Sequence, residues 1–194
     1  KKVFFLNDDD VSEYVKRKIL HVSKCFTING IGINNDEFCY NTKLPEEKNV
    51  IMLSRLIKNK GIFDYCEIAK KVRAVRRDIK FYLYGEESQI KKTDLIEYIN
   101  RGDIIYGGYS FDTKSLISNS RIIVSCSKRE GLPRVVLESM ALRRIVIGTN
   151  CVGNRHSIIN GKTGYLIEIG NIDSFVDTIF LQNSIVSCLL TSYL

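Results

Sequence analysis

Residues 127–141 read SKREGLPRVVLESMA, and this stretch says more about the chain than any other. It holds two glutamates, Glu130 just before a turn and Glu138 two helical turns further on. Pro133 is predicted to be the first helical residue, because its missing N–H and its fixed φ are tolerated at that position. The start of such a helix offers free N–H groups and a partial positive charge, which suit a phosphate or another anion.

Two carboxylates beside an anion site are explained if they bind hydroxyl groups of the same ligand. A nucleotide sugar has this pattern, since its anionic centre lies between ribose hydroxyls on one side and sugar hydroxyls on the other. The simpler alternative is a helix with one capping acid and one surface acid, which is common for a pair of glutamates. The two glutamates alone leave both interpretations open.

The composition is that of an ordinary globular protein with excess positive charge. Its 194 residues, 44% of them apolar, suffice for one domain or for one domain and part of another. A net charge of +7 favours acidic partners, namely phosphorylated small molecules, anionic lipid surfaces or nucleic acid. The cysteines form no C-x-x-C pair and mostly lie in apolar runs, which predicts reduced core residues of a cytoplasmic protein: Cys25, Cys39, Cys66, Cys126, Cys151 and Cys188.

Neither the ends of the chain nor its histidines suggest a membrane anchor or a metal site. No signal peptide or membrane-spanning segment is found. Residues 175–194 are apolar but carry polar side chains, which favours a core helix or a helix that contacts a partner. His21 and His156 are isolated from any cysteine pair, so structural zinc is not expected. The chain opens on a strand without an initial Met, and we expect it to be a piece of a longer polypeptide.

Short β-branched or aromatic runs alternate with segments of helical spacing. The predicted strands are Val3–Leu6, Cys25–Ile28, Val50–Leu53, Lys80–Tyr84, Ile104–Tyr106, Ile122–Ser125, Ile145–Gly148 and Gly164–Ile167. The predicted helices are Gly61–Arg77, Glu87–Asn100, Phe111–Ser118, Pro133–Leu142 and Ile172–Leu181. This alternation predicts an α/β fold, a Rossmann-like parallel sheet with helices on both faces.

Ligands of such sheets bind outside the carboxyl ends of the strands, so the residues that follow each strand are the candidates for a site. Arg55 and Lys60 follow one strand, and an arginine and a lysine together suit a diphosphate. Gly85 follows the next strand and would let a ligand approach the backbone closely. Gly108 and Tyr109 follow another, where the tyrosine either stacks on a ring or packs in the core. Taken alone, Arg55 and Lys60 are better explained as solvated surface cations.

Read together, these segments resemble the carboxyl-terminal, donor-binding domain of the GT-B retaining glycosyltransferases of family four (glycosyl transferases group 1), which include bacterial polysaccharide and mannosyl transferases. The resemblance covers roughly residues 3–181 in order. The matching motifs are residues 28–33 followed by Phe38, Ser54-Arg55-Leu56 with Lys60-Gly61, Gly85, residues 127–133, residues 137–141, Gly153-Asn154-Arg155 and residues 160–164.

The resemblance implies roles for these residues. Arg55 and Lys60 would hold the diphosphate of a UDP-, GDP- or ADP-sugar and offset charge on the leaving group. Glu138 would bind the ribose hydroxyls, and Glu130 would lie near the sugar. The backbone of Gly131, Leu132, Pro133 and Arg134 would meet the sugar and the phosphate, and residues near Gly85, Gly108 and Tyr109 would border the base. Glu130, Arg55 and Lys60 would thus act in catalysis without a metal or another cofactor, and retention of configuration follows from the resemblance alone.

The chain departs from the family pattern in two places and matches only part of a GT-B enzyme. Arg143 and Arg144 stand where a glycine is usual, and His156 stands where a glutamate is common; His156 is assigned no role. Residues 1–35 resemble a remnant of the amino-terminal acceptor domain with the interdomain link, and residues 36–194 resemble the nucleotide-sugar-binding domain. We therefore expect the chain alone to bind a nucleotide sugar but to transfer little or none, with the missing amino-terminal domain and a saccharide or lipid-linked acceptor as its partners.

Three functions are consistent with these observations. The first is the donor-binding half of a glycosyltransferase that makes bacterial surface polysaccharide, in the cytoplasm and compatible with peripheral contact at the inner face of the membrane. The second is a GT-B sugar-nucleotide epimerase or hydrolase. The third is a non-enzymatic basic module that binds nucleic acid or membrane; it lacks an arginine-rich tract and basic-aromatic interleaving, so nucleic acid is not expected as a partner. The donor base, the sugar, the acceptor and the oligomeric state are not specified by the sequence.

Overall fold

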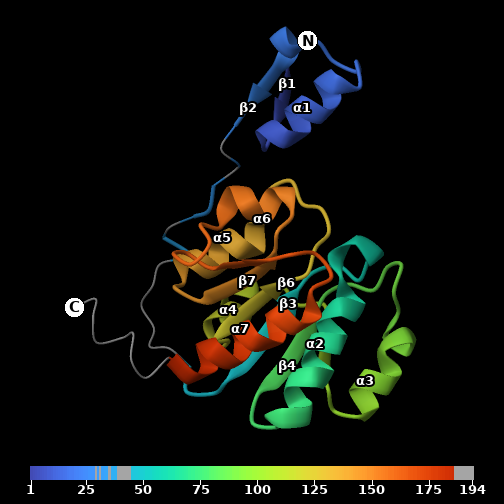
Figure 1. Cartoon of the computed structure of the whole chain (residues 1–194), viewed down its shortest axis with the longest axis vertical. Coiled ribbons are helices and arrows are strands. Elements are labelled where there is room, and N and C mark those ends of the chain that lie inside the picture. The colour runs from blue at the N-terminus through green and yellow to red at the C-terminus, as the bar shows by residue number, and fades with distance from the viewer. Residues whose placement is uncertain (29, 31, 35, 39–44, 186–194) are drawn as a thin grey trace, which may run out of the picture.

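Six parallel strands form the main sheet in the computed structural model, which describes residues 1–28, 30, 32–34, 36–38 and 45–185. The strand order is β5-β4-β3-β6-β7-β8, and every pair of neighbours is parallel (Figure 1). The strands are β3 (Asn49–Leu53), β4 (Lys80–Tyr84), β5 (Ile105–Gly108), β6 (Ile122–Ser125), β7 (Ile145–Thr149) and β8 (Tyr165–Ile167).

The central strands form because their side chains are apolar on both faces. Along β3, Val50 and Met52 belong to one core cluster and Ile51 belongs to the other. β6 repeats this alternation, with Ile122 and Val124 on the first side and Ile123 on the second. Successive side chains of a strand point to opposite faces, so a continuous apolar run requires cover on both faces.

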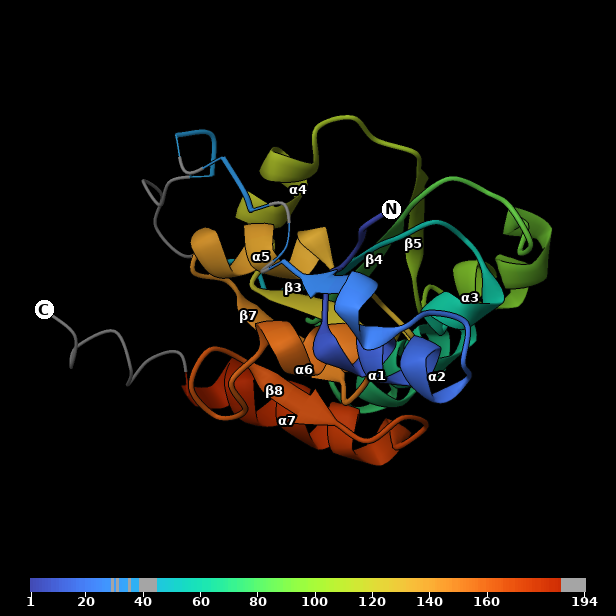
Figure 2. The same cartoon turned by 90° about the horizontal axis from the view of Figure 1, so that it is seen from above.

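Helices supply that cover on the two faces of the sheet (Figure 2). The first core cluster packs under α2 (Ile62–Val75) and α7 (Ile172–Ile185), together with η3 (Lys92–Leu95) and α3 (Ile96–Asn100). The second cluster packs under α4 (Thr113–Ser118) and α5 (Arg134–Ala141), and it includes Ile158, the residue that follows α6 (Val152–Ser157). The predicted α/β fold with a parallel sheet and helices on both faces is confirmed. None of the helices in the described residues is long and apolar enough to span a membrane.

Residues 1–28, here called the N-terminal unit, form a separate two-stranded parallel sheet with one helix (Figure 1). Its elements are β1 (Val3–Phe5), α1 (Asp8–Lys16), η1 (Val22–Lys24) and β2 (Cys25–Thr27). α1 contains no buried residue, and several apolar side chains of the unit are exposed, among them Phe4, Ile19 and Val22. The domain boundary predicted at residue 35 lies outside the described residues, as do the last nine residues of the predicted C-terminal segment.

Some predicted elements are wrong in type or extent. The segment predicted as one helix over Glu87–Asn100 is helical only from Lys92 onward. Its first part is held instead by backbone hydrogen bonds to the chain after β3, from Leu56 N to Glu86 O at 2.9 Å and from Ile90 N to Leu56 O at 2.9 Å. A segment that gives its backbone groups to a distant partner cannot use them in a local helix.

Other corrections concern the ends of helices. Residues 152–154 form the first turn of α6, which is not among the predicted helices, and the predicted helix Ile172–Leu181 continues to Ile185. Asp8, Asp9 and Asp10 form the first turn of α1, and Asn7 is the residue that caps this helix. Acidic side chains are favourable in a first turn as well as at a cap, so the pattern did not fix the helix start.

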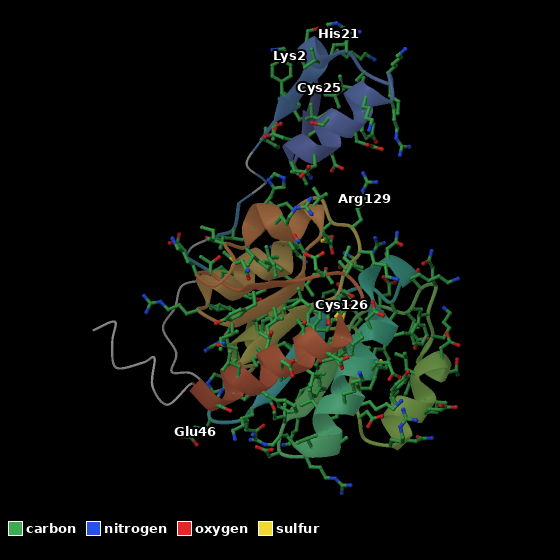
Figure 3. All side chains as sticks on the ribbon, viewed as in Figure 1. Lys2, His21, Cys25, Glu46, Cys126 and Arg129 are labelled. Carbon is green, nitrogen blue, oxygen red and sulfur yellow. The ribbon has the colours of Figure 1, made fainter. Side chains whose placement is uncertain are left out.

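The loop after β3 is pressed against the loop after β6 at Gly61. Gly61 joins η2 (Lys58–Lys60) to α2 with a left-handed φ of +68°. A Cβ at this residue would lie 2.2 Å from the backbone oxygen of Cys126, which is labelled in Figure 3. The amide of Lys128 also donates to the backbone oxygen of Asn59 at 2.8 Å. Only glycine permits this approach of two loops that are distant in sequence.

We expect Gly61→Ala to lower the free energy of unfolding by about 2–5 kcal/mol, the sum of a left-handed backbone penalty and a clash with rigid backbone. Urea denaturation measures this change. Gly102→Ala is the matched control, because Gly102 has a φ of +73° but no atom within 4 Å of the added Cβ. Its loss should be only about 1–2 kcal/mol, and equal losses in the two variants would contradict the close contact.

Candidate functional site

A cavity of about 280 Å³ opens at the carboxyl ends of β3 and β6. Arg55 and Lys60 come from the loop after β3. Glu130 comes from residues 127–133, here called the Glu130 loop, and Arg134 begins α5. The lining residues are Met52, Leu53, Ser54, Arg55, Lys60, Ile123, Val124, Ser125, Ser127, Glu130, Leu132, Pro133, Arg134, Val135 and Val136. The predicted cations and the first predicted acid therefore share one cavity.

Lys60 and Glu130 form an ion pair across this cavity. The Lys60 ammonium contacts Oε1 of Glu130, and the Ser127 hydroxyl donates to the same oxygen at 2.7 Å. The two side chains are largely covered, with exposed fractions of 21% for Lys60 and 16% for Glu130. Oε2 of Glu130 accepts no hydrogen bond from any described residue. The carboxylate thus holds Lys60 in place and keeps one oxygen available to a ligand.

The start of α5 faces the same cavity. Pro133 was predicted to be the first helical residue, but it is the N-cap of α5. Its side chain provides no capping hydrogen bond. The backbone N–H groups of Arg134 and Val135 donate to no other described residue. Two unpaired amides at the positive end of an eight-residue helix favour an anion at this point.

Glu138, the second predicted acid, lies one helical turn beyond Arg134 and is only 3% exposed. Arg134 Nε donates to its Oε1 at 2.6 Å. Burial raises the pKa of the Glu138 carboxyl and the charge of Glu37 adds to this effect, whereas the hydrogen bond from Arg134 opposes it. Glu138 does not line the cavity, although its partner Arg134 does.

Arg55 connects the first cavity to a second one of about 180 Å³. Its side chain is exposed and forms no ion pair within the part of the chain that the structure describes. The second cavity is lined by Leu53, Ser54, Arg55, Tyr84, Gly85, Glu86, Tyr109, Ser110, Thr113 and Val135. An unpaired guanidinium at the junction of two cavities is well placed to bind an anionic group that bridges them.

Two backbone segments meet closely at Gly85, which lines the second cavity. A Cβ on Gly85 would lie 1.7 Å from the backbone oxygen of Ser54, so this position excludes any side chain. The amide of Gly85 donates to the oxygen of Gly108 at 2.8 Å, which brings the predicted Gly108 to the same rim. Tyr109 is 61% exposed and packs edge-to-face on Phe111, with ring centroids 4.8 Å apart. Tyr109 is therefore an exposed ring at the cavity mouth, not a buried packing residue.

The structure thus places Arg55, Lys60, Glu130, Leu132, Pro133 and Arg134 around one cavity and Gly85 and Tyr109 around its neighbour. Gly131 is part of the Glu130 loop, and Glu138 is paired with Arg134. Ser127 was not predicted as a hydrogen-bond partner of Glu130, although a serine three residues before an acid is close enough in sequence to suggest one. It also missed Ser54, Glu86 and Thr113, which lie at or beyond the ends of strands. In the described ranges, no group of three His, Cys, Asp or Glu side chains could hold a metal ion.

Comparison with known proteins assigns the family. The family model of glycosyl transferases group 1 matches residues 34–181, and the chain belongs to this family. A capsular polysaccharide biosynthesis glycosyltransferase from Staphylococcus aureus, CapM, is 25% identical over 189 residues, covering 87% of this chain and 50% of CapM. A poly(ribitol-phosphate) alpha-N-acetylglucosaminyltransferase from Staphylococcus aureus strain COL is 32% identical over 162 residues, covering 81% of this chain and 32% of that protein.

Solved structures show the same fold. The crystal structure of TarM has a TM-score of 0.85 and 25% identity, and the match covers 95% of this chain and 37% of TarM. A mutant of S. aureus TarM in complex with fondaparinux, alpha-GlcNAc-glycerol and UDP has a TM-score of 0.82 and 27% identity, covering 94% of this chain and 37% of that one. The chain therefore spans half or less of the length of these proteins.

We expect Lys60→Ala to lower the free energy of unfolding by about 1–3 kcal/mol, because it leaves the covered Glu130 carboxylate with Ser127 as its remaining hydrogen-bond partner. Urea denaturation measures the change. Lys71→Ala is the control, since Lys71 pairs with Asp173 at 2.6 Å while both side chains are well exposed. That loss should stay within about 0–1 kcal/mol, and a loss as small for Lys60→Ala would mean that the pair adds nothing to stability.

We expect Glu138→Gln to change how stability depends on pH. The pKa of Glu138 is raised in the native state above its ordinary value of 4.5, so the native state binds this proton more tightly than the unfolded state does. The resulting stability is present below the unfolded pKa and is lost as the pH rises through the raised native pKa. The free energy of unfolding of Glu138→Gln minus that of the wild type should therefore increase between about pH 4 and pH 7.

Urea denaturation at a series of pH values tests this dependence. Glu97→Gln, which changes a carboxylate on α3 that is 84% exposed, serves as the control. A difference for Glu138→Gln that stays constant or decreases across this range would show that burial does not govern this carboxyl group.

Proposed function

We propose that this chain is the nucleotide-sugar-binding half of a glycosyltransferase that acts in bacterial surface polysaccharide synthesis. The observation that carries the proposal is the single cavity in which Arg55, Lys60, Glu130 and the unpaired amides at the start of α5 meet. Family membership and the names of the relatives support this class of reaction. Because the chain spans half or less of these relatives, activity and acceptor belong to the whole protein.

In this proposal, the diphosphate of the nucleotide sugar lies between Arg55 and the start of α5. Arg55 offers a planar pair of N–H donors, and Arg134 N and Val135 N add backbone donors beside the positive end of the helix. When the glycosidic bond breaks, negative charge develops on the departing nucleoside diphosphate. Donors that are already in place stabilise that charge most in the transition state, and one such donor is worth about 2.7–4 kcal/mol.

Lys60 and Glu130 act as a unit in the same proposal. Glu130 fixes the Lys60 ammonium beside the leaving diphosphate, and its second oxygen accepts a hydroxyl group of the sugar. The lysine charge also offsets the repulsion between the carboxylate and the phosphates. Glu138 binds the ribose hydroxyls once Arg134 turns away from it, which frees the Arg134 guanidinium to meet the diphosphate.

The base occupies the second cavity, against the backbone at Gly85 and the exposed ring of Tyr109. We propose UDP as the nucleotide, supported by the UDP in the complex of the TarM mutant. A saccharide or lipid-linked acceptor and an amino-terminal acceptor-binding domain complete the proposal. The free cysteines of the described residues support a cytoplasmic location, and the net charge of +7 supports peripheral contact with an anionic membrane surface.

We expect the chain to bind UDP and Arg55→Ala to weaken that binding by about 1.5–3 kcal/mol, which is about tenfold or more in Kd, because a charged hydrogen-bond donor to the diphosphate is lost. Isothermal titration calorimetry measures the Kd. A thermal-shift series provides a second readout, since ligand at a hundredfold above its Kd stabilises the fold by about 2.7 kcal/mol.

Arg77→Ala is the matched control, because Arg77 is an exposed arginine between α2 and β4, at the opposite edge of the sheet. The control should bind UDP as the wild type does. Equal losses in the two variants would show that general charge, not the cavity, attracts the nucleotide. Wild-type chain that binds no UDP-, GDP- or ADP-sugar at millimolar concentration would overturn the proposed function.

A further inference from the structure

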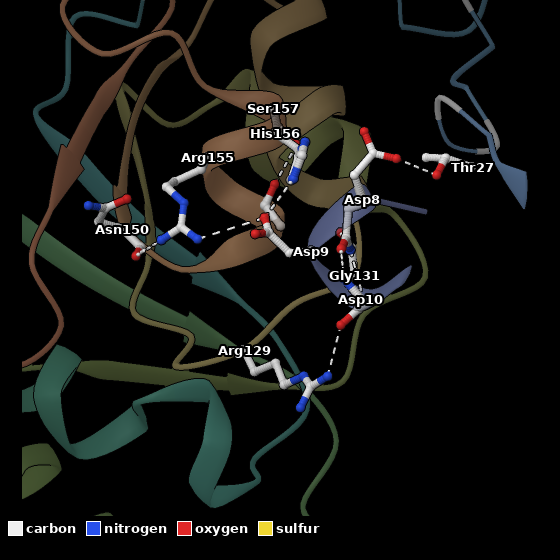
Figure 4. A network of polar contacts seen from close by, with 12 residues as sticks. Asp8, Asp9, Asp10, Thr27, Arg129, Gly131, Asn150, Arg155, His156 and Ser157 are labelled. Carbon is white, nitrogen blue, oxygen red and sulfur yellow. Dashed lines mark hydrogen bonds and ion pairs between the residues drawn. The ribbon is translucent and has the colours of Figure 1, made fainter. Parts of the chain in front are cut away.

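The first turn of α1 touches the two residues that flank Glu130. Asn7, Asp8, Asp9 and Asp10 are here called the aspartate turn. Arg129 donates to Oδ1 of Asp10 at 2.8 Å, and Asn7 Nδ2 donates to the backbone oxygen of Gly131 at 3.2 Å (Figure 4). These contacts join residues more than a hundred positions apart in the chain, and they hold the Glu130 loop on both sides of its acid.

The aspartate turn also reaches α6, the helix behind the Glu130 loop. Asp9 lies 3.0 Å from Nε2 of His156 and 3.8 Å from the guanidinium of Arg155 (Figure 4). α6 packs directly on the loop, because a Cβ on Gly153 would lie 2.6 Å from the Cβ of Glu130. The N-terminal unit therefore contacts both the Glu130 loop and α6, the helix that packs on this loop.

Asn7 makes this contact more than a pair of exposed charges. It is only 1% exposed, and its side chain uses both of its polar atoms. Oδ1 accepts the amide of Asp10 at 2.7 Å, while Nδ2 donates to Asp10 Oδ2 at 2.9 Å as well as to Gly131. A buried amide with every contact satisfied fixes geometry far better than a surface ion pair does.

We propose that the aspartate turn positions the Glu130 loop for the nucleotide sugar, with Asn7, Asp9 and Asp10 as positioning residues that do not touch the ligand. The inference rests on the proposed function, since the ligand is the one named there. The loop contains Gly131, whose backbone is otherwise free to take many conformations. Holding that loop from the N-terminal unit sets the Glu130 carboxylate and the following amides before the ligand arrives. By linkage, the bound ligand tightens the N-terminal unit on the loop to the same extent.

Charge and geometry predict opposite results for Asp10→Ala. Removal of a negative charge near an anion site should strengthen UDP binding if only the electrostatic field matters. Loss of the contact that positions the loop should weaken it, and we expect the Kd for UDP to rise about five- to tenfold. Isothermal titration calorimetry on the full 194-residue chain measures the sign directly. A Kd that is unchanged or lower in Asp10→Ala would overturn the proposal.

A double-mutant cycle separates positioning from direct contact with the ligand. We expect Arg129→Ala to weaken UDP binding as much as Asp10→Ala does, and the double variant to be no weaker than either single one. The exchanged pair, Asp10→Arg with Arg129→Asp, should recover most of the lost affinity. If Arg129 bound the diphosphate itself, Asp10→Ala would not weaken binding and the exchanged pair would not recover it, which would overturn the proposal.

Asn7→Ser tests the buried amide. Serine still accepts the capping hydrogen bond of α1, but its side chain is shorter and loses the amide N–H that donates to Gly131. The helix should therefore fold normally while the Kd for UDP rises. Lys71→Ala with Asp173→Ala is the control, because it removes an exposed ion pair of similar length that lies between α2 and α7. An effect of the control pair as large as that of Asn7→Ser would overturn the proposal.

A distance measurement reads the contact without the ligand. Spin labels at Val22→Cys and Ile159→Cys, both at exposed positions, report how the N-terminal unit sits on α6 and its neighbours. Cys25, Cys39 and Cys188 are changed to Ser in this background. The distance distribution should be narrow in the wild type and broad in Asn7→Ser and Asp10→Ala; equal widths would overturn the proposal. Narrow wild-type distances without any UDP binding would instead refute the proposed function and leave the contact intact.

Discussion

The close approach of two loops at Gly61 is the constraint on which the candidate site depends. In a parallel sheet, the loops after neighbouring strands leave from the same edge. β3 and β6 are neighbours although α2, β4, η3, α3, β5 and α4 all lie between them in the sequence. The left-handed glycine lets the turn after β3 sit on the backbone of Cys126. Lys60 can then pair with Glu130, which is 70 positions away in the sequence. A side chain at residue 61 would hold these two charges apart.

Much of the fold was predictable because its strands are local patterns. Runs such as Val50–Leu53 and Ile122–Ser125 are apolar on both faces, and the structure has strands at these places within one or two residues. The failure over residues 87–91 has a physical cause that no local pattern contains, since the backbone there bonds to the segment after β3. The candidate site was predictable to the same degree: Arg55, Lys60 and Glu130 all follow strands of one sheet, so topology alone brings them to one rim.

The pairing of charges within the site was not predictable. The sequence offers many cations and acids, and it does not state that Lys60 pairs with Glu130 while Arg55 remains unpaired among the described residues. The spacing of Arg134 and Glu138 is a partial exception, because residues four apart on a helix are neighbours. The contacts of the aspartate turn were the least predictable from the sequence. Its acids fit the start of a helix, and their second set of contacts, with Arg129, Arg155 and His156, comes only from the placement of the N-terminal unit.

The guanidinium that covers Glu138 also has a thermodynamic consequence. A carboxylate enclosed by protein must be stripped of water before a sugar ring can reach it, and that dehydration normally opposes binding. Arg134 already substitutes for the water around Glu138, in a contact of 2.6 Å. If Glu138 binds the ribose as proposed, the incoming pair of hydroxyls exchanges one set of N–H donors for O–H donors and removes little solvent. In the proposed complex the ribose hydroxyls take the place of the Arg134 guanidinium, which shields the Glu138 carboxyl from water while no ligand is bound.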